Sequence, residues 1–345
     1  MKRMVNNRMP LFGGHQLHRP TIRSVIGLVL GVVLVAILNL SLGDQRIGFI
    51  HAVRALWGEG DPDHVLIIQT LRAPRILVAL LVGAALAVSG AILQGVIRNP
   101  LAAPDVVGIT GGASVGAVAF ITYMPSAVSI HWMPLAAILG AFMATMLIYV
   151  IAWRQGVNPL RLVLVGIGIS SLLSAMTSFM LVFSPAYSAS SAYIWLTGTI
   201  YGSTWTHVAI LLPWMTFCAI LMCFYMRPMN LQLLTDETAI GLGSHVQRYR
   251  IILILISLCL AGVAVSVGGV IGFVGLIAPH VARKLVGPIY SRLIPVSALF
   301  GAIVVALADL VGRTAFLPLD IPVGVFTSGI GAPFFIYLLY RSRRK

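Results

Sequence analysis

The chain is poor in charged residues: of 345 residues only 9% are Asp, Glu, Lys or Arg, whereas 59% are hydrophobic. A soluble domain carries about 25% charged residues and about 45–50% apolar ones. The composition therefore excludes a soluble globular enzyme, and it excludes a disordered chain for the same reason. Because a membrane-crossing helix needs about 20 apolar residues, the sequence predicts an all-α, polytopic membrane protein.

Acidic residues are scarcer than basic ones, and only three lysines and three cysteines are present. Nine Asp and Glu stand against 23 Lys and Arg, which gives a net charge of +14. No basic run alternates with aromatic residues, so nucleic-acid binding is disfavoured; positive residues that flank spans and set their orientation explain the charge better. Cys218, Cys223 and Cys259 lie in apolar stretches with neither metal-ligand spacing nor a disulfide framework.

The sequence also lacks the motifs of ATP binding, catalysis and metal binding. No phosphate-cradling G-x-x-x-x-G-K-[ST] loop occurs, and no grouping of Ser, His and Asp or of metal ligands stands out. No expected span carries a charged residue at mid-depth, which disfavours an ion-coupled carrier. We therefore expect no enzymatic activity, no metal site and no cofactor in this chain, and energy for active transport would come from a partner.

Apolar runs and their breakers predict ten spans between a basic arm, residues 1–23, and a basic tail, residues 341–345. The 24–340 region is expected to be one ten-helix domain. The spans are expected at about Ser24–Leu42, Ile76–Ile97, Val106–Tyr123, Pro134–Ala152, Leu160–Phe183, His207–Tyr225, Ile251–Val267, Ile271–Val286, Leu293–Val311 and Ile321–Tyr340.

The distribution of basic residues predicts the orientation. With ten alternating spans and a cytoplasmic N-terminus, eighteen of the 23 Lys and Arg lie inside. Such a bias is typical of cytoplasmic loops. The five that remain outside are Arg46, Arg54, Arg72, Arg75 and Arg313. We therefore expect both termini in the cytoplasm.

Small residues form stripes at helical spacing on three of the spans. Close helix packing through small residues is one interpretation, and the lining of a solute pathway is the other. Gln94 is informative because an amide inside a span needs a partner or water. The stripes consist of Gly83, Ala87, Gly90 and Gln94; of Gly166, Ser170, Ser174 and Ser178; and of Gly324, Thr327, Ser328 and Gly331.

Two loops have specific content. Arg72 and Arg75 precede the second span on the expected outer side, where they either snorkel to the interface or dock an acidic partner. The longest internal loop holds a predicted short helix with Thr235 as N-cap and acidic residues in its first turn. That helix either fits a socket on another protein or is a surface linker. The residues of this loop helix and its end are Thr235, Asp236, Glu237, Thr238, Ala239, Gly241, Leu242 and Gly243.

Several motifs in order resemble the iron-chelate and cobalamin permease family of ABC importers, often called the FecCD family. The resemblance covers about residues 24–340. Its motifs are L-R-A-P-R at 71–75, V-G-A-A-L-A-V-S-G-A-I-L-Q at 82–94, N-P-L-A-A-P at 99–104, R-P-M-N at 227–230, A-I-G-L-G at 239–243, I-G-F-V-G-L-I-A-P-H at 271–280, A-D-L-V-G-R at 308–313 and the segment 319–339.

The resemblance implies partners and roles. Two ten-span permeases, identical or related, would pair with two cytoplasmic ATPase subunits that bind ATP and magnesium, and an extracytoplasmic binding protein would deliver the solute. Arg72 and Arg313 match the family's docking arginines, and the loop at about 230–248 matches its ATPase-coupling loop. Family gates map to Leu101 and to Val157–Asn158–Pro159, where the sequence departs from the small hydroxyl residues of some relatives.

The function that follows is import of a ferric siderophore across the cytoplasmic (inner) membrane of a bacterium. Cobalamin or haem is the alternative substrate within the family. A secondary carrier or channel that works alone is the alternative of a different class, and the scarcity of charge inside the spans disfavours it.

Overall fold

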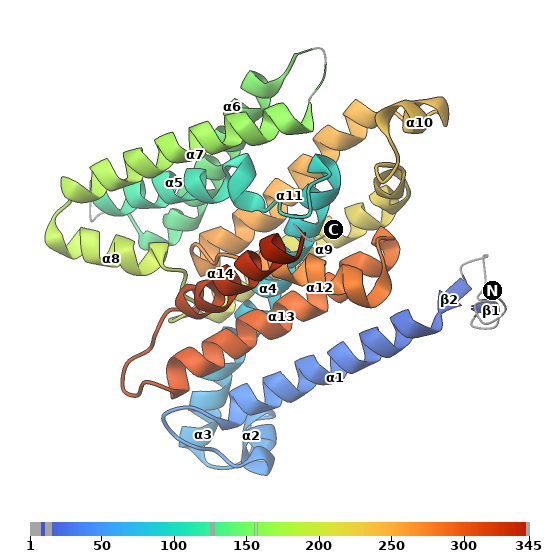
Figure 1. The fold of residues 1–345 in the computed structure, drawn as a ribbon. Coiled ribbons are helices and arrows are strands. Elements are labelled where there is room, and N and C mark those ends of the chain that lie inside the picture. The colour runs from blue at the N-terminus through green and yellow to red at the C-terminus, as the bar shows by residue number, and fades with distance from the viewer. Residues whose placement is uncertain (1–7, 11–15, 125–127, 155, 157, 343–345) are drawn as a thin grey trace.

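The computed structural model describes residues 8–10, 16–124, 128–154, 156 and 158–342, and it is built almost entirely from helices (Figure 1). Two short strands, β1 (Arg8–Pro10) and β2 (Gln16–His18), pair antiparallel before the first helix. The longer helices are α1 (Arg19–Ser41), α4 (Ala73–Ile97), α5 (Ile109–Tyr123), α6 (Met133–Ala152), α7 (Pro159–Val182), α9 (Trp205–Leu231), α11 (Val246–Gly268), α12 (Val274–Val286), α13 (Tyr290–Thr314) and α14 (Val323–Ser342).

Each of the ten expected spans coincides with one of these helices. Within the described residues, seven helical segments are long and apolar enough to cross a membrane, and two more, Ile109–Tyr123 and Val323–Tyr337, are shorter apolar helices. The remaining helix, α12, has 13 residues; at 1.5 Å per residue it is about 20 Å long, short of the roughly 30 Å hydrocarbon core. The chain is a multi-pass membrane protein, and the count of ten spans and the cytoplasmic termini stay predictions.

Helix α4 lies at the centre of the fold, and most of its residues are buried. Its neighbours come close because glycines face one another. A Cβ atom added to Gly83 would lie 2.3 Å from the carbonyl oxygen of Gly301 in α13, and one added to Gly90 would lie 1.8 Å from that of Gly275 in α12. Ser89 and Ser257 join α4 to α11 through hydroxyls 2.7 Å apart. This stripe of α4 is therefore a packing surface, one of the two interpretations given above.

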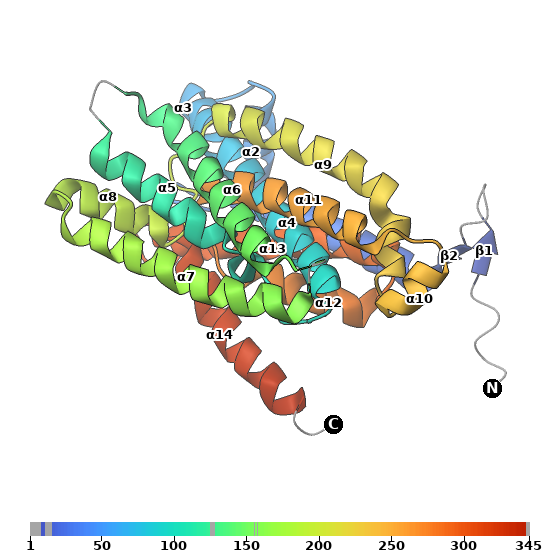
Figure 2. The same cartoon turned by 90° about the horizontal axis from the view of Figure 1, so that it is seen from above.

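Several peripheral helices expose apolar faces. In Figure 2, α14 projects away from the body of the bundle. The exposed apolar side chains include Ile330 and Ile336 on α14, Leu164 and Phe179 on α7, and Leu30 on α1. In a membrane protein such faces contact lipid or another chain, because no internal core covers them.

Seven of the described helices are short, and only the last of them, the loop helix capped by Thr235, was predicted from the sequence. They are α2 (Phe49–Leu56), α3 (Pro62–Leu66), the π-helix η1 (Ile67–Arg72), the 3₁₀ helices η2 (Pro104–Val107) and η3 (Ile130–Trp132), α8 (Ala186–Leu196) and α10 (Asp236–Gly241). α1 also begins at Arg19, inside the expected arm, with Pro20 in its first turn, where proline is well tolerated.

We expect Gly90→Ala to destabilise the protein, because the new methyl group would collide with the backbone of α12. Overpacking of this kind costs about 1–3 kcal/mol, and more where the backbone must move. Gly27→Ala in α1 is the matched control, since nothing lies within 4 Å of a Cβ at that position. Thermal unfolding of the purified variants in detergent measures the effect; equal midpoints for the two variants would contradict the packing described here.

Candidate functional site

At the C-terminal end of α13 and the start of α4, a partly buried ionic cluster joins distant parts of the chain. Arg75 places its two terminal nitrogens 2.7 Å from an oxygen of Asp309 and 2.6 Å from an oxygen of Asp320. Asp309 is only 1% exposed. The guanidinium of Arg75 also lies 5.7 Å from the ring centre of Tyr201. Charge-assisted pairs of this fork geometry are strong and directional, so Arg75 fixes the segment that precedes α14 against α4.

The two expected docking arginines lie beside this cluster, and both are largely buried. Arg72 donates to the carbonyl oxygens of Leu40 and Gln45, each at 2.5 Å. Arg313 donates to the backbone oxygen of Asn39 at 2.5 Å and to its side-chain oxygen at 3.0 Å. Both guanidinium groups therefore hold the end of α1. Their docking role stays a prediction, and the sequence analysis did not predict this internal role.

A second cluster lies at the opposite end of α4, where the expected coupling helix is located. Thr235 caps α10 by accepting a hydrogen bond from the backbone of Thr238, as the sequence predicts. Oδ1 of Asp236 lies 2.5 Å from Nη2 of Arg98 and 3.3 Å from Nη2 of Arg250, and forms an ion pair with each. Ile240 and Leu242 of this loop are exposed, so the loop offers an apolar surface to a partner while its first turn is held by two arginines.

Arg98 is the functional candidate that sequence reasoning missed. It ends α4 in the left-handed conformation, with φ 55°, and its guanidinium also donates to the carbonyl oxygens of Gln232 and Leu234. Non-glycine residues adopt this conformation rarely. Arg98 therefore ties the end of α4 directly to the segment that leads into α10, a contact between residues 138 positions apart that spacing alone does not reveal.

The expected gate and pathway residues on α4 and its following turn lie next to this tie. Leu101 is partly buried in a turn in which its backbone N–H donates to Asn99 Oδ1 at 2.9 Å. Gln94 accepts a hydrogen bond from Arg283 at 2.7 Å and donates to the carbonyl of Leu276. The amide of Gln94 is thus satisfied by α12, as a buried amide requires.

The other expected pathway residues belong to α7. Asn158 caps this helix by accepting from the backbone of Leu160, and Val157 of the same gate segment lies outside the described residues. Gly166 packs under η2, since a Cβ there would lie 1.8 Å from the carbonyl of Val106. Ser170 donates to the carbonyl of Asp105 at 3.0 Å, and Ser174 is exposed. α7 therefore packs on η2 with the first half of its stripe and leaves the second half open.

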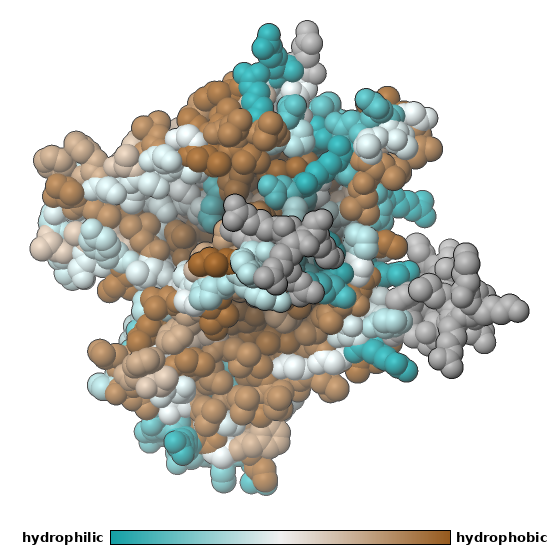
Figure 3. Space-filling model, in the orientation of Figure 1, coloured by the Kyte–Doolittle hydropathy of each residue, from teal (hydrophilic) through white to brown (hydrophobic). Residues whose placement is uncertain are grey.

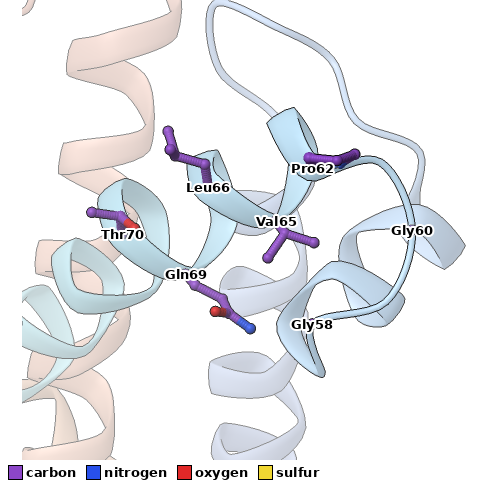
Figure 4. Close-up of a pocket in the computed structure, with 7 residues that line it drawn as sticks. All are labelled: Gly58, Gly60, Pro62, Val65, Leu66, Gln69 and Thr70. Carbon is purple, nitrogen blue, oxygen red and sulfur yellow. The ribbon is translucent and has the colours of Figure 1, made fainter.

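A hollow of about 400 Å³ lies elsewhere, between the end of α2 and η1 (Figure 4). Gly58, Gly60, Pro62, Val65, Leu66, Gln69 and Thr70 line it. The amide of Gln69 points toward the end of α2 and donates to the carbonyls of Ala55 and Leu56 at 3.2 Å. None of the expected site residues lines this hollow, and its one long polar side chain is already hydrogen-bonded.

Comparison with known proteins identifies the fold and the family. The model of the FecCD transport family matches residues 31–341. The achromobactin transport system permease protein of Dickeya dadantii is 46% identical over 95% of this chain and 94% of its own length. An iron(3+)-hydroxamate import system permease of Bacillus subtilis is 39% identical over 90% of this chain and 94% of its own length. A cobalamin import system permease of Halobacterium salinarum is 46% identical over 79% of this chain and 73% of its own length.

Among solved structures, an inward-facing conformation of a metal-chelate type ABC transporter superposes with a TM-score of 0.83. It is 32% identical to this chain and covers 93% of it and 99% of the solved chain. With nearly all of the predicted permease region matched by the family model and by full-length relatives, this chain belongs to the FecCD transport family of permeases.

Proposed function

We propose that this chain is the permease subunit of an ATP-driven importer that moves a ferric siderophore across the cytoplasmic membrane of a bacterium. The family match over residues 31–341 carries the proposal, and permeases for iron chelates among the full-length relatives favour the substrate. Iron would travel wrapped in its chelator as cargo, so the permease itself needs no metal ligands.

The proposal includes partners on both faces of the membrane. Two ATPase subunits would bind ATP and magnesium and grip the loop around α10. A second permease, identical or related, would complete the pathway, and a binding protein would deliver the cargo from outside. The exposed apolar face of α10 and the exposed faces of α7 and α14 support such contacts. No cofactor is proposed for this chain.

Import of cobalamin or haem is the alternative within the family, and a cobalamin permease among the relatives favours cobalamin. A secondary carrier that works alone stays the alternative of a different class. It would need a titratable or ion-binding group along its path.

Deletion of the gene tests the proposed substrate. We expect uptake of a radio-iron siderophore to fall to the background level while uptake of labelled cobalamin is unchanged, because the deleted subunit forms the membrane path of one substrate class only. Re-expression from a plasmid is the control for effects on neighbouring genes. Unchanged iron uptake together with lost cobalamin uptake would transfer the assignment to the alternative substrate.

Docking through Arg313 is tested with two variants that separate the positive charge of this residue from the paired hydrogen bonds of its guanidinium group. Arg313→Gln removes the charge, and Arg313→Lys keeps it but loses the double hydrogen bond to Asn39. If the charge pairs with an acidic residue of the binding protein, a contact of about 1.5–3 kcal/mol is lost only in Arg313→Gln, which raises the dissociation constant of the binding protein by roughly 10- to 100-fold.

Binding of the binding protein to the assembled importer at low and high salt measures this effect, and thermal unfolding monitors the structural role of the arginine. Equal weakening in both variants would assign Arg313 to structure alone and remove it from the docking surface.

We expect Asp236→Asn to uncouple ATP hydrolysis from uptake. The substitution weakens the tie between α10 and Arg98, so motion of α10 would reach the end of α4 less directly. The Arg98–Asp236 pair is partly exposed and contributes about 0–1 kcal/mol to stability. The amide oxygen of Asn can still accept a hydrogen bond from the buried Arg250, so the complex should still assemble. Glu237→Gln, at the next carboxylate of α10, is the matched control. Transport per ATP hydrolysed in proteoliposomes is the measurement; a ratio equal to that of Glu237→Gln would contradict this role of Asp236.

A further inference from the structure

Helix α2 has three distinct faces, although it contains only eight residues. At about 100° per residue, Phe49, Ile50, Val53, Leu56 and the following Trp57 fall within one contiguous arc of about 120°. His51 and Arg54 form a neighbouring polar arc. Ala52 and Ala55, which are 1% and 0% exposed, occupy the third arc.

The alanine face attaches α2 to the rest of the protein. Ala52 and Ala55 join Ile47 and Ile68 in a small separate core, against which Leu40 of α1 also packs. The carbonyls at the end of α2 receive the amide of Gln69 from η1. Attachment on this face and at this end fixes the orientation of α2, and therefore the direction in which its apolar arc points.

The apolar arc has no partner within the described part of the chain. Phe49 is 51% exposed, Ile50 is 64% exposed and Trp57 is 79% exposed. Contiguous apolar exposure of this kind on a folded protein marks a surface that another phase or molecule covers.

The position of α2 indicates what covers that surface. Figure 1 places α2 and α3 at the edge of the bundle, beside the C-terminal end of α1, where Leu40 of α1 packs against the small core under α2. α1 itself exposes Ile26, Leu30 and Leu34, an apolar face that only lipid or another membrane chain can cover. In Figure 3 hydrophobic residues extend over this part of the molecule from α1 toward α2, and hydrophilic residues appear at its lower edge. The exposed apolar arc of α2 thus lies next to the end of α1, a helix that itself exposes apolar side chains.

We propose that α2 lies in the headgroup and acyl boundary of the phospholipid leaflet at the C-terminal end of α1, with its apolar arc toward the acyl chains. Phenylalanine, isoleucine and tryptophan on one face, with a histidine and an arginine beside them, are typical of helices that lie in this boundary. Arg54 is placed to reach lipid phosphate, and the indole of Trp57 suits the depth at which tryptophan collects. Under the proposed topology this is the outer leaflet.

Lipid contact here anchors the segment that carries η1 and leads into α4. Gln69 and Arg72 of η1 hold the ends of α2 and α1 respectively. An α2 held by the leaflet therefore fixes the start of α4 relative to the membrane surface, independently of any substrate.

Spin labels on adjacent residues test the proposal. The three native cysteines are replaced by alanine, and single cysteines are introduced by Val53→Cys on the apolar arc and His51→Cys on the polar arc. The full-length chain, assembled with its partner subunits, is reconstituted into phosphatidylethanolamine and phosphatidylglycerol liposomes without the binding protein. Collision of each nitroxide with oxygen, which concentrates in lipid, and with a water-soluble nickel chelate is then measured.

We expect the oxygen-to-nickel ratio to be several-fold higher at Val53 than at His51. Equal nickel access at both positions would place α2 in water and overturn the proposal. Exclusion of both reagents from Val53 would identify a protein as the occupant and overturn it as well. Ile50→Cys, on the same arc, replaces Val53→Cys if that variant fails to assemble. Because the readout does not require transport, its failure is distinct from failure of the proposed function.

Discussion

Close approach of helix backbones around α4 is the constraint on which the rest of this structure depends. Inside a membrane, burial of apolar surface does not by itself drive helices together, because lipid chains are as apolar as the side chains. Association then requires surfaces that fit closely, and glycine allows the closest fit. Gly83 faces Gly301 and Gly90 faces Gly275, so α13 and α12 both rest directly on the α4 backbone.

This packing makes α4 a rigid connection between the two clusters of polar residues. Its 25 residues extend over about 38 Å at 1.5 Å per residue. Arg75 near its start binds two carboxylates of the α13–α14 region, and Gln94 and Arg98 at its end contact Arg283 of α12 and Asp236 of α10. α10 is therefore tied to one end of α4, and the other end of α4 holds the segment before α14. Side-chain contacts at the two ends of α4 therefore join the two polar clusters through a single helix.

The sequence predicted the helices of this fold well and their relations poorly. Ten apolar runs each became a helix because the bilayer requires the same signal, a long apolar stretch, from every span. Thr235 was predicted correctly as a cap because capping is a local interaction. α2 and α8 were not predicted, because helices this short lack the long apolar stretch by which the spans were found. The shortness of α12 was not predicted either, because the apolar run in the sequence begins before the helix does. The pairing of Arg98 with Asp236 joins positions far apart in the chain, and a single sequence contains no record of such contacts.

The burial of Arg72 and Arg313 limits how these residues could bind a partner at the predicted outer surface. A guanidinium has five N–H donors, and backbone oxygens of Asn39 and Leu40 in α1 and of Gln45 just after it use part of this capacity. An acidic partner could then use only the donors that still point outward, and its approach would compete with bonds that hold α1 in place. Docking at these arginines would therefore act on the same contacts that position α1, α4 and α13 relative to one another. For this reason a binding protein that paired with them would do more than attach to the permease: it would alter the arrangement of helices around the start of α4.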